Sequence, residues 1–157
     1  MRGSSAAAVT KQLSPRNGTR PRNELRGFDR ETRLYHVWFS TKQRKWLLAG
    51  DVEIQAKRLL TRIAADKGID LRRCETMVDH VHLMLSTRAD ELSRQVKLLK
   101  GISARGLFQE FPDLKLDART DHFWQRGFGY RELEGGEARR VAWYIGTQKR
   151  RSGKYES

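Results

Sequence analysis

Hydrophobic and polar positions alternate at two different periods along the chain. From Leu34 to Thr41 apolar side chains occupy every second position, and this period-two pattern predicts a strand over residues 34–41. After a short basic turn, apolar side chains recur at helical spacing from Asp51, which we expect to cap a helix that ends at Gly68. The first third of the folded region is therefore predicted to be a strand followed by a helix.

The remaining pattern continues in the same two periods. It predicts, in order, strands at 70–78 and 80–87 with a turn near Met77 and Val78, a helix from Asp90 to Pro112, a loop at 113–121, a strand at 123–133, and a helix at 137–151.

This order of elements predicts an α+β fold. Strand, helix, strand, strand, helix, strand is the ferredoxin-like βαββαβ arrangement, an antiparallel sheet with its helices on one face, here followed by a C-terminal helix. We expect the other face of the sheet to be left open for binding. Because this fold hosts many activities, function has to be argued from a site.

Composition narrows the class of protein. The 157 residues suit a single domain, and 32 Lys and Arg against 19 Asp and Glu give a net charge of +13, which favours a polyanionic partner. Residues 1–33 hold eight basic and three acidic residues and little apolar surface, so we expect a flexible basic arm before a folded domain at 34–157. Cys74 is the only cysteine, which excludes an intrachain disulfide. No apolar run is long enough to span a membrane, and we expect a cytoplasmic protein that does not contact membranes.

Two histidines stand two apart in a predicted strand. His80 and His82 should project from the same face, with Val81 and Leu83 directed into the core. Two imidazoles are at most half of a metal site, and by itself such a pair also suits surface histidines.

A tyrosine and an amide stand four apart in the last predicted helix. Tyr144 and Gln148 should share one face of that helix, one turn apart. By itself this spacing also suits a partly buried aromatic residue and a solvated glutamine.

Together these stretches resemble a known family. The resemblance rests on Asp-His-Val-His-Leu-Met at 79–84, Leu-Lys-Gly-Ile-Ser-Ala-Arg at 99–105, Phe123-Trp124 followed by Gly127 and Gly129, Tyr144-Ile145 with Gln148, and Tyr-His-Val-Trp-Phe-Ser-Thr-Lys at 35–42. In this order, over residues 34–150, the chain resembles the single-tyrosine transposases of the His-hydrophobic-His (HUH) superfamily, of the insertion-sequence type and related to the transposases associated with repetitive extragenic palindromes (REP).

The resemblance implies a site and a reaction. His80, His82 and Gln148 would be ligands of a divalent metal, Mg or Mn, and Tyr144 would be the nucleophile that cleaves and rejoins single-stranded DNA through a 5′-phosphotyrosine. It also implies hairpin-containing DNA as substrate and a homodimer, in which Tyr144 could serve the metal site of its own chain or of its partner.

Basic and aromatic side chains are candidates for contacts with DNA. Three tryptophans, Trp46, Trp124 and Trp143, are available for base stacking, and we expect at least two of them to be packing residues instead. The candidate phosphate contacts are Lys42, Arg44, Lys45, Lys97, Lys100, Arg105, Lys149 and Arg150.

Alternatives remain open at this point. A noncatalytic nucleic-acid-binding domain, or a host-adopted relative that binds repetitive palindromes, would explain the charge, and a hydrolytic metallonuclease would not need Tyr144. Tyr130 is a rival nucleophile that ranks below Tyr144 because no amide or imidazole accompanies it at helical spacing. His36 and His122 are expected to be structural or close to DNA rather than metal ligands.

Overall fold

A computed structural model describes residues 31–119 and 121–152. The elements are β1 (Thr32–Ser40), the 3₁₀ turn η1 (Lys42–Arg44), α3 (Gly50–Asp66), β2 (Asp70–Thr76), β3 (His80–Arg88), α4 (Leu92–Glu110), α5 (Leu114–Ala118), β4 (Gly129–Leu133) and α6 (Glu137–Ser152).

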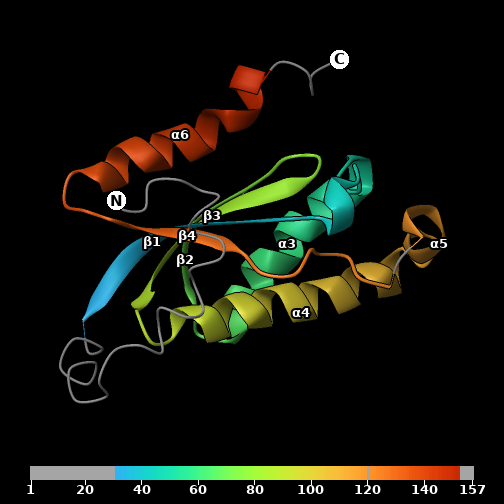
Figure 1. The fold of residues 1–157 in the computed structure, drawn as a ribbon, viewed down its shortest axis with the longest axis horizontal. Helices are drawn as coiled ribbons and strands as arrows, with labels where there is room; N and C mark the ends of the chain where they lie inside the picture. The colour runs from blue at the N-terminus through green and yellow to red at the C-terminus, as the bar shows by residue number, and fades with distance from the viewer. Residues whose placement is uncertain (1–30, 120, 153–157) are drawn as a thin grey trace.

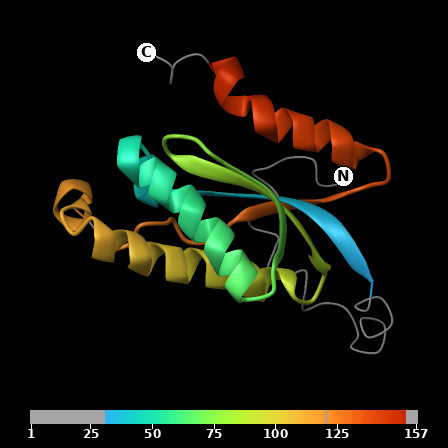
Figure 2. The same ribbon diagram turned by 180° about the vertical axis from the view of Figure 1, so that it is seen from behind.

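The four strands form one antiparallel sheet in the order β2-β3-β1-β4. Helices α3 and α4 lie against one face of the sheet, and α6 lies over the other (Figures 1 and 2). The α+β fold with the ferredoxin-like strand order is therefore confirmed. The turn expected near Met77 and Val78 is also confirmed, since β2 ends at Thr76 and β3 begins at His80.

The last strand is shorter than the predicted span of 123–133. Trp124 forms only an isolated bridge with Thr41, and the regular ladder begins at Gly129. The Gln125 N–H still donates to the carbonyl group of Ser40. The carbonyl groups of Gln125 and Gly127 each accept a hydrogen bond from the Lys100 ammonium group, so a side chain of α4 holds the segment before β4.

Three other local predictions are corrected. The predicted loop at 113–121 contains the short helix α5, which ends at Arg119 in the left-handed conformation. Asp51 does not cap α3, because the helix starts one residue earlier and its cap is Ala49; Asp51 instead lies in the first turn, where a carboxylate favours the helix dipole. The first strand spans Thr32–Ser40, so it begins two residues ahead of the predicted 34–41.

The main core lies between the sheet and α3 and α4. The alternation of β1 and β3 directs Val37, Leu83 and Leu85 into it with no exposed surface, and α4 contributes Leu99 from the opposite side. Leucine and valine side chains of this kind each contribute roughly 1.5–3 kcal/mol when fully buried. This face supplies most of the burial that holds the fold.

The other face of the sheet is not left fully open. Met84 of β3, Leu133 of β4 and Ile145 of α6 form a second, smaller buried cluster that holds α6 on the sheet. At the start of α6 the Arg131 guanidinium lies 3.1 Å from a carboxylate oxygen of Glu137. Helix α6, which carries Tyr144, is therefore fixed to β4 and to β3, the strand of His80 and His82.

Candidate active site

The two histidines of β3 project from the face covered by α6, as their spacing predicts. Their Nε2 atoms lie 3.2 Å apart, with the rings nearly perpendicular at 81°. Val81 and Leu83, which alternate with them, have no exposed surface and lie in the main core. The strand alternation therefore brings two imidazole nitrogens to one point outside the core.

Each of these rings has a second partner at Nδ1. Nδ1 of His80 lies 2.7 Å from a carboxylate oxygen of Asp79, and Nδ1 of His82 lies 3.0 Å from Nε2 of His36. Asp79 is in turn held by Arg44, whose Nε and NH2 atoms both lie 3.2 Å from its other oxygen. Five side chains, from β1, η1, the β2–β3 turn and β3, thus form one connected chain.

Burial keeps the imidazole rings of His82 and His36 neutral. It lowers the pKa of His82 to about 3, with further contributions from His36 and His80, and lowers the pKa of His36 to about 4, with a contribution from Arg131. Both rings are therefore neutral near pH 7, the form in which an imidazole nitrogen can accept a hydrogen bond or bind a metal ion.

Tyr144 lies on the same side of the sheet as the imidazoles. Its ring centroid is 6.3 Å from that of His82, at an interplanar angle of 80°, and 36% of the residue is exposed. On the next position of α6, Ile145 is fully buried in the second cluster. Burial of Ile145 thus fixes the turn of helix that presents the phenol.

The chemistry of this arrangement fits a divalent cation. Two adjacent ligand atoms at about 2.1 Å from an octahedral ion lie about 3.0 Å apart, close to the 3.2 Å between the two Nε2 atoms. The Nδ1 partners are of the kind that orient metal-binding histidines. Within the described ranges no group of three or more His, Cys, Asp or Glu residues is placed to hold a metal ion.

The remaining residues predicted for the site lie at the end of α6. Gln148, Lys149 and Arg150 belong to the helix, but their side chains fall outside the described residues. Their predicted roles stay predictions.

The predicted phosphate contacts fall into two groups. Lys97 and Arg105 are exposed on α4, and Lys42 and Lys45 are half-buried beside η1. The remaining described candidates, Arg44 and Lys100, bind within the protein.

Lys100 does not face solvent as its position on α4 suggests. Burial lowers its pKa to about 8, and its ammonium group also stands 5.5 Å from the Phe39 ring centroid. Its donors bind the carbonyl groups that precede β4, so its observed role is structural.

The tryptophans differ from expectation. Trp124 is buried and donates a hydrogen bond to Ser103, whereas Trp46 and Trp143 are exposed, so one of the three is a packing residue rather than two.

Two aromatic residues of β1 were not assigned to the site from the sequence. His36 is in contact with His82, and the Trp38 ring lies 4.9 Å from the His36 ring. Trp38 also crosses Gly129, where an added Cβ would stand 2.3 Å from the indole. The alternation of β1 shows that both residues share a face, but only the β1–β3 register brings that face beside His80 and His82.

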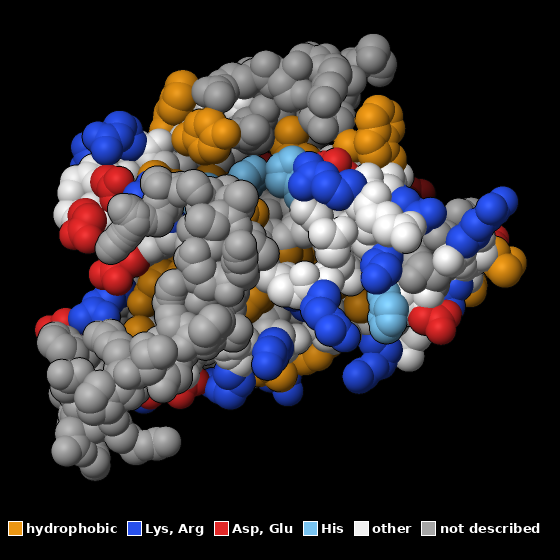
Figure 3. All heavy atoms as spheres, viewed as in Figure 1, with side chains coloured by type: hydrophobic (Ala, Val, Ile, Leu, Met, Phe, Trp, Pro, Cys, Tyr) orange, Lys and Arg blue, Asp and Glu red, His pale blue; other side chains and the backbone are white. Residues whose placement is uncertain are grey.

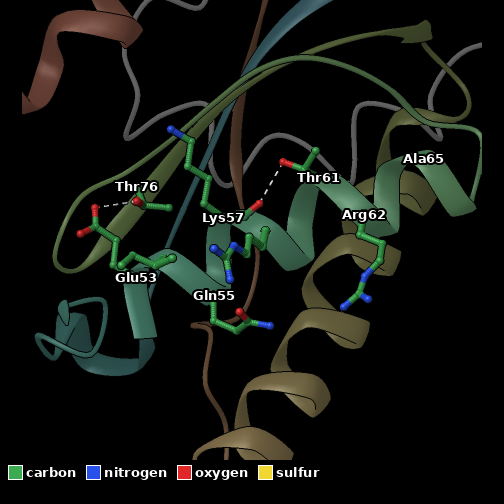
Figure 4. Close-up of a pocket in the computed structure, with 9 residues that line it drawn as sticks. Glu53, Gln55, Lys57, Thr61, Arg62, Ala65 and Thr76 are labelled. Carbon is green, nitrogen blue, oxygen red and sulfur yellow. Dashed lines mark hydrogen bonds between the residues drawn. The ribbon is translucent and has the colours of Figure 1, made fainter. Parts of the chain in front are cut away.

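The surface around the site is basic. In the view of Figure 3, histidine side chains reach the surface, and Lys and Arg side chains gather around and below them. A separate pocket lies on the outer side of α3, on the opposite face of the sheet (Figure 4). Among its lining residues Thr76 donates to Glu53 at 2.8 Å, and Lys57 pairs with Glu75 outside the pocket. That pocket lacks the imidazoles and the phenol.

Paired histidines on an antiparallel sheet, with a tyrosine on the helix above them, are the arrangement that the resemblance predicts for a transposase, a class of DNA-cleaving enzyme. Comparison with family models makes the class specific. Residues 30–148 match the model described as Transposase IS200 like, and the chain belongs to this family.

Individual relatives agree with this assignment. The chain is 34% identical over 115 residues to the ISDra2 transposase TnpA of Deinococcus radiodurans, which covers 73% of this chain and 82% of the relative. It is 29% identical to the transposase for insertion sequence element IS200 of Salmonella typhimurium, over 73% of this chain and 75% of the relative.

Solved structures show the same fold. A crystal structure of a transposase from Deinococcus radiodurans R1 superposes with a TM-score of 0.61 at 31% identity, over 74% of this chain and 91% of that one. A REP-associated tyrosine transposase bound to a REP hairpin superposes with a TM-score of 0.55 at 14% identity, over 77% and 68%. In the part of the chain that the structure describes, no helix is long and apolar enough to cross a membrane.

Proposed function

We propose that this transposase cleaves and rejoins single-stranded DNA, with Tyr144 as the nucleophile and His80 and His82 as ligands of a divalent metal ion. The observation that carries the proposal is the position of the Tyr144 ring, 6.3 Å from the His82 ring and on the same face of the sheet as the two converging Nε2 atoms. Among the described tyrosines, Tyr35 and Tyr130 pack in or against the main core instead.

The chemistry follows from these positions. The Tyr144 oxygen attacks the phosphorus of a phosphodiester, the bond to the 3′ oxygen breaks, and the products are a 5′-phosphotyrosine and a free 3′-hydroxyl. The proton lost by the phenol balances the one gained by the 3′ oxygen. One phosphoester replaces another, so the step is reversible and a second 3′-hydroxyl can rejoin the strand without a nucleoside triphosphate.

The metal ion would be held by the Nε2 atoms of His80 and His82, and by Gln148 as the third protein ligand. When bound, Mg²⁺ or Mn²⁺ supplies Lewis-acid polarisation of a non-bridging phosphate oxygen. Imidazole nitrogens and an amide oxygen leave room for water and for phosphate oxygen around such an ion.

The substrate class follows from the charge and from a relative. The REP-associated tyrosine transposase of known structure is bound to a DNA hairpin, and we extend that substrate class to this chain. Exposed Lys97 and Arg105 are suited to phosphate contacts, and exposed Trp46 and Trp143 are suited to stacking on unpaired bases.

A labelled single-stranded hairpin tests the proposal. Incubation with Mn²⁺ and denaturing electrophoresis should show a covalent adduct that Tyr144→Phe abolishes. Cleavage without an adduct would identify a hydrolytic nuclease, and binding without cleavage would identify a noncatalytic domain; either result would contradict the proposal. Tyr130→Phe is the matched control and should retain the adduct.

The subunit that supplies the tyrosine is tested separately. We propose a homodimer in which each Tyr144 serves its own chain, because α6 packs on its own sheet and the phenol already faces His82 of the same chain. Mixing Tyr144→Phe with His80→Ala subunits should then recover no cleavage, whereas recovery would show that the tyrosine crosses to the partner.

We also propose that the basic segment before the domain adds nonspecific affinity for DNA, because it carries a net charge of +5 over residues 1–33. Since β1 begins at Thr32, the deletion that tests this should stop at residue 30. Unchanged salt-dependent binding after that deletion would dismiss the role.

A further inference from the structure

We propose that His36 is a positioning residue for His82, and that a paired tautomer change of the two rings lets His82 Nε2 alternate between donating a hydrogen bond and binding a metal ion. This inference rests on the proposed function, in which His80 and His82 bind the ion. It assigns a role to a β1 histidine that the reaction itself does not use.

The direction of the hydrogen bonds starts at Asp79. Its carboxylate, held by Arg44, can only accept, so the hydrogen of the 2.7 Å contact belongs to Nδ1 of His80. A neutral imidazole with its hydrogen on Nδ1 has a lone pair on Nε2. In the neutral form of His80, the lone pair of Nε2 therefore points to the Nε2 atom of His82, 3.2 Å away.

Without a metal ion, that contact needs a hydrogen from His82. Two lone pairs facing each other would repel, whereas an N–H group on His82 Nε2 donates to His80. Nδ1 of His82 then carries a lone pair and must accept, so the 3.0 Å contact to His36 is a hydrogen bond donated by His36 Nε2. The three rings form a continuous directed chain, from His36 through His82 and His80 to Asp79.

With an ion bound by both Nε2 atoms, the hydrogen bond between His36 and His82 must run in the opposite direction. His82 must carry its hydrogen on Nδ1 and donate to His36, so His36 Nε2 must accept and hold its own hydrogen on Nδ1. Each ring keeps one hydrogen in both states, and the site gains or loses no proton. Residue 36 therefore has to donate in one state and accept in the other.

The surroundings of His36 hold its ring in place for this exchange. The ring lies against Trp38 at a centroid distance of 4.9 Å, and Trp38 crosses Gly129 of the neighbouring strand. In the β1–β3 ladder Trp38 is paired with His82, which places His36 diagonally opposite that ring. The contact is thus set by backbone register and not by a mobile loop.

Long-range ¹H–¹⁵N correlation spectra of the full chain test the tautomers directly. In metal-free protein near pH 7 we expect the hydrogen on Nε2 of His36 and His82 and on Nδ1 of His80. Saturation with Mg²⁺ should move it to Nδ1 in both His36 and His82. A metal-free spectrum with the hydrogen already on Nδ1 of His82 would overturn the inference, as would a spectrum in which His36 does not change.

Substitution tests the consequence for metal affinity. His36→Phe keeps a ring but can neither donate nor accept, and we expect calorimetry to show about 10–100-fold weaker Mn²⁺ binding, the usual cost of losing such a partner. His36→Gln, whose amide both donates and accepts, should recover part of that loss. His122→Phe is the matched control at an exposed histidine outside the site and should bind Mn²⁺ as the parent does.

A third variant separates the two proposals. If His80→Ala loses Mn²⁺ binding while folded His36→Phe binds normally, the role of His36 is wrong and the metal site stands. If His80→Ala binds Mn²⁺ normally, the proposed metal site itself is wrong. Thermal unfolding of each variant shows whether it is folded. If His36→Phe is not folded, the spectra of the unmodified chain decide the inference.

Discussion

On one face of the sheet, α3 and α4 pack against β1 and β3 through a continuous apolar core; on the other face, α6 packs through the small cluster formed by Met84 of β3, Leu133 of β4 and its own Ile145. The same alternation serves both faces, since Val81 and Leu83 point into the core while His80 and His82 point toward α6. One face of β3 therefore supplies side chains to the core, and the other face supplies side chains to the candidate active site. Substitutions on the two faces should therefore affect different measurements.

The largest effect should come from the phenol on the α6 face. Tyr144→Phe removes the oxygen that we propose as the nucleophile and should lower adduct formation at least about 1,000-fold, as loss of a nucleophile does. Because Tyr144 is 36% exposed, the free energy of unfolding should change by no more than about 0.5 kcal/mol. Adduct assays and urea unfolding together check both expectations, and a strongly destabilised variant would contradict the separation of the two faces.

The converse effect should appear on the α3 and α4 face. Leu83→Ala removes a fully buried side chain and should lower the free energy of unfolding by about 2–5 kcal/mol. Ile145 is equally buried, but it belongs to α6 and packs against the other face of the sheet. Ile145→Ala should reduce adduct formation more than it reduces global stability, because it loosens the helix that carries the phenol. Equal losses of stability and activity in the two variants would break the comparison.

A smaller effect should follow from the close approach of Trp38 to β4. An alanine at residue 129 would place its Cβ 2.3 Å from the indole, so Gly129→Ala should displace Trp38 and cost about 1–3 kcal/mol of stability. Gly101→Ala is the control, since nothing lies within 4 Å of its added Cβ and alanine suits the interior of α4 better than glycine. Thermal unfolding of the pair measures the difference.

The smallest effect should distinguish the two kinds of lysine on α4. Lys97→Ala removes an exposed charge and should reduce the slope of log affinity against log salt for single-stranded DNA by about 0.7. Lys100→Ala should instead lower stability, because its ammonium group binds the carbonyl groups before β4. Identical salt slopes for Lys97→Ala and the parent would remove Lys97 from the DNA interface.

The parts of the molecule that could be predicted from sequence are those set by local periodicity. The period-two pattern identified the strands and placed His80 and His82 on one face, and Gly68, at a positive φ of 70°, ends the helical signal as expected. The order of elements then defined the fold. The pattern could not show α5, whose five residues are too few for a helical period.

The missed features depend on contacts between distant segments. His36 was not assigned to the site because its contact with His82 requires the β1–β3 register, which no local pattern contains. The contact of Lys100 with DNA stays a prediction, but its hydrogen bonds to Gln125 and Gly127 could not be predicted, because that segment lies 25 or more residues away. In both cases the residue type allowed such a contact, but the spacing of residues along the chain did not indicate its partner.

The modest size of the cluster beneath α6 has a kinetic consequence. Helices held by few buried contacts open in sub-global excursions that leave the rest of a domain intact. Backbone amides of α6 should therefore exchange with deuterated solvent sooner than those of α4, which contributes Leu99 and Leu107 to the larger core. In the proposed reaction, such excursions would give a DNA end bound to Tyr144 room to exchange one acceptor strand for another before the helix packs again.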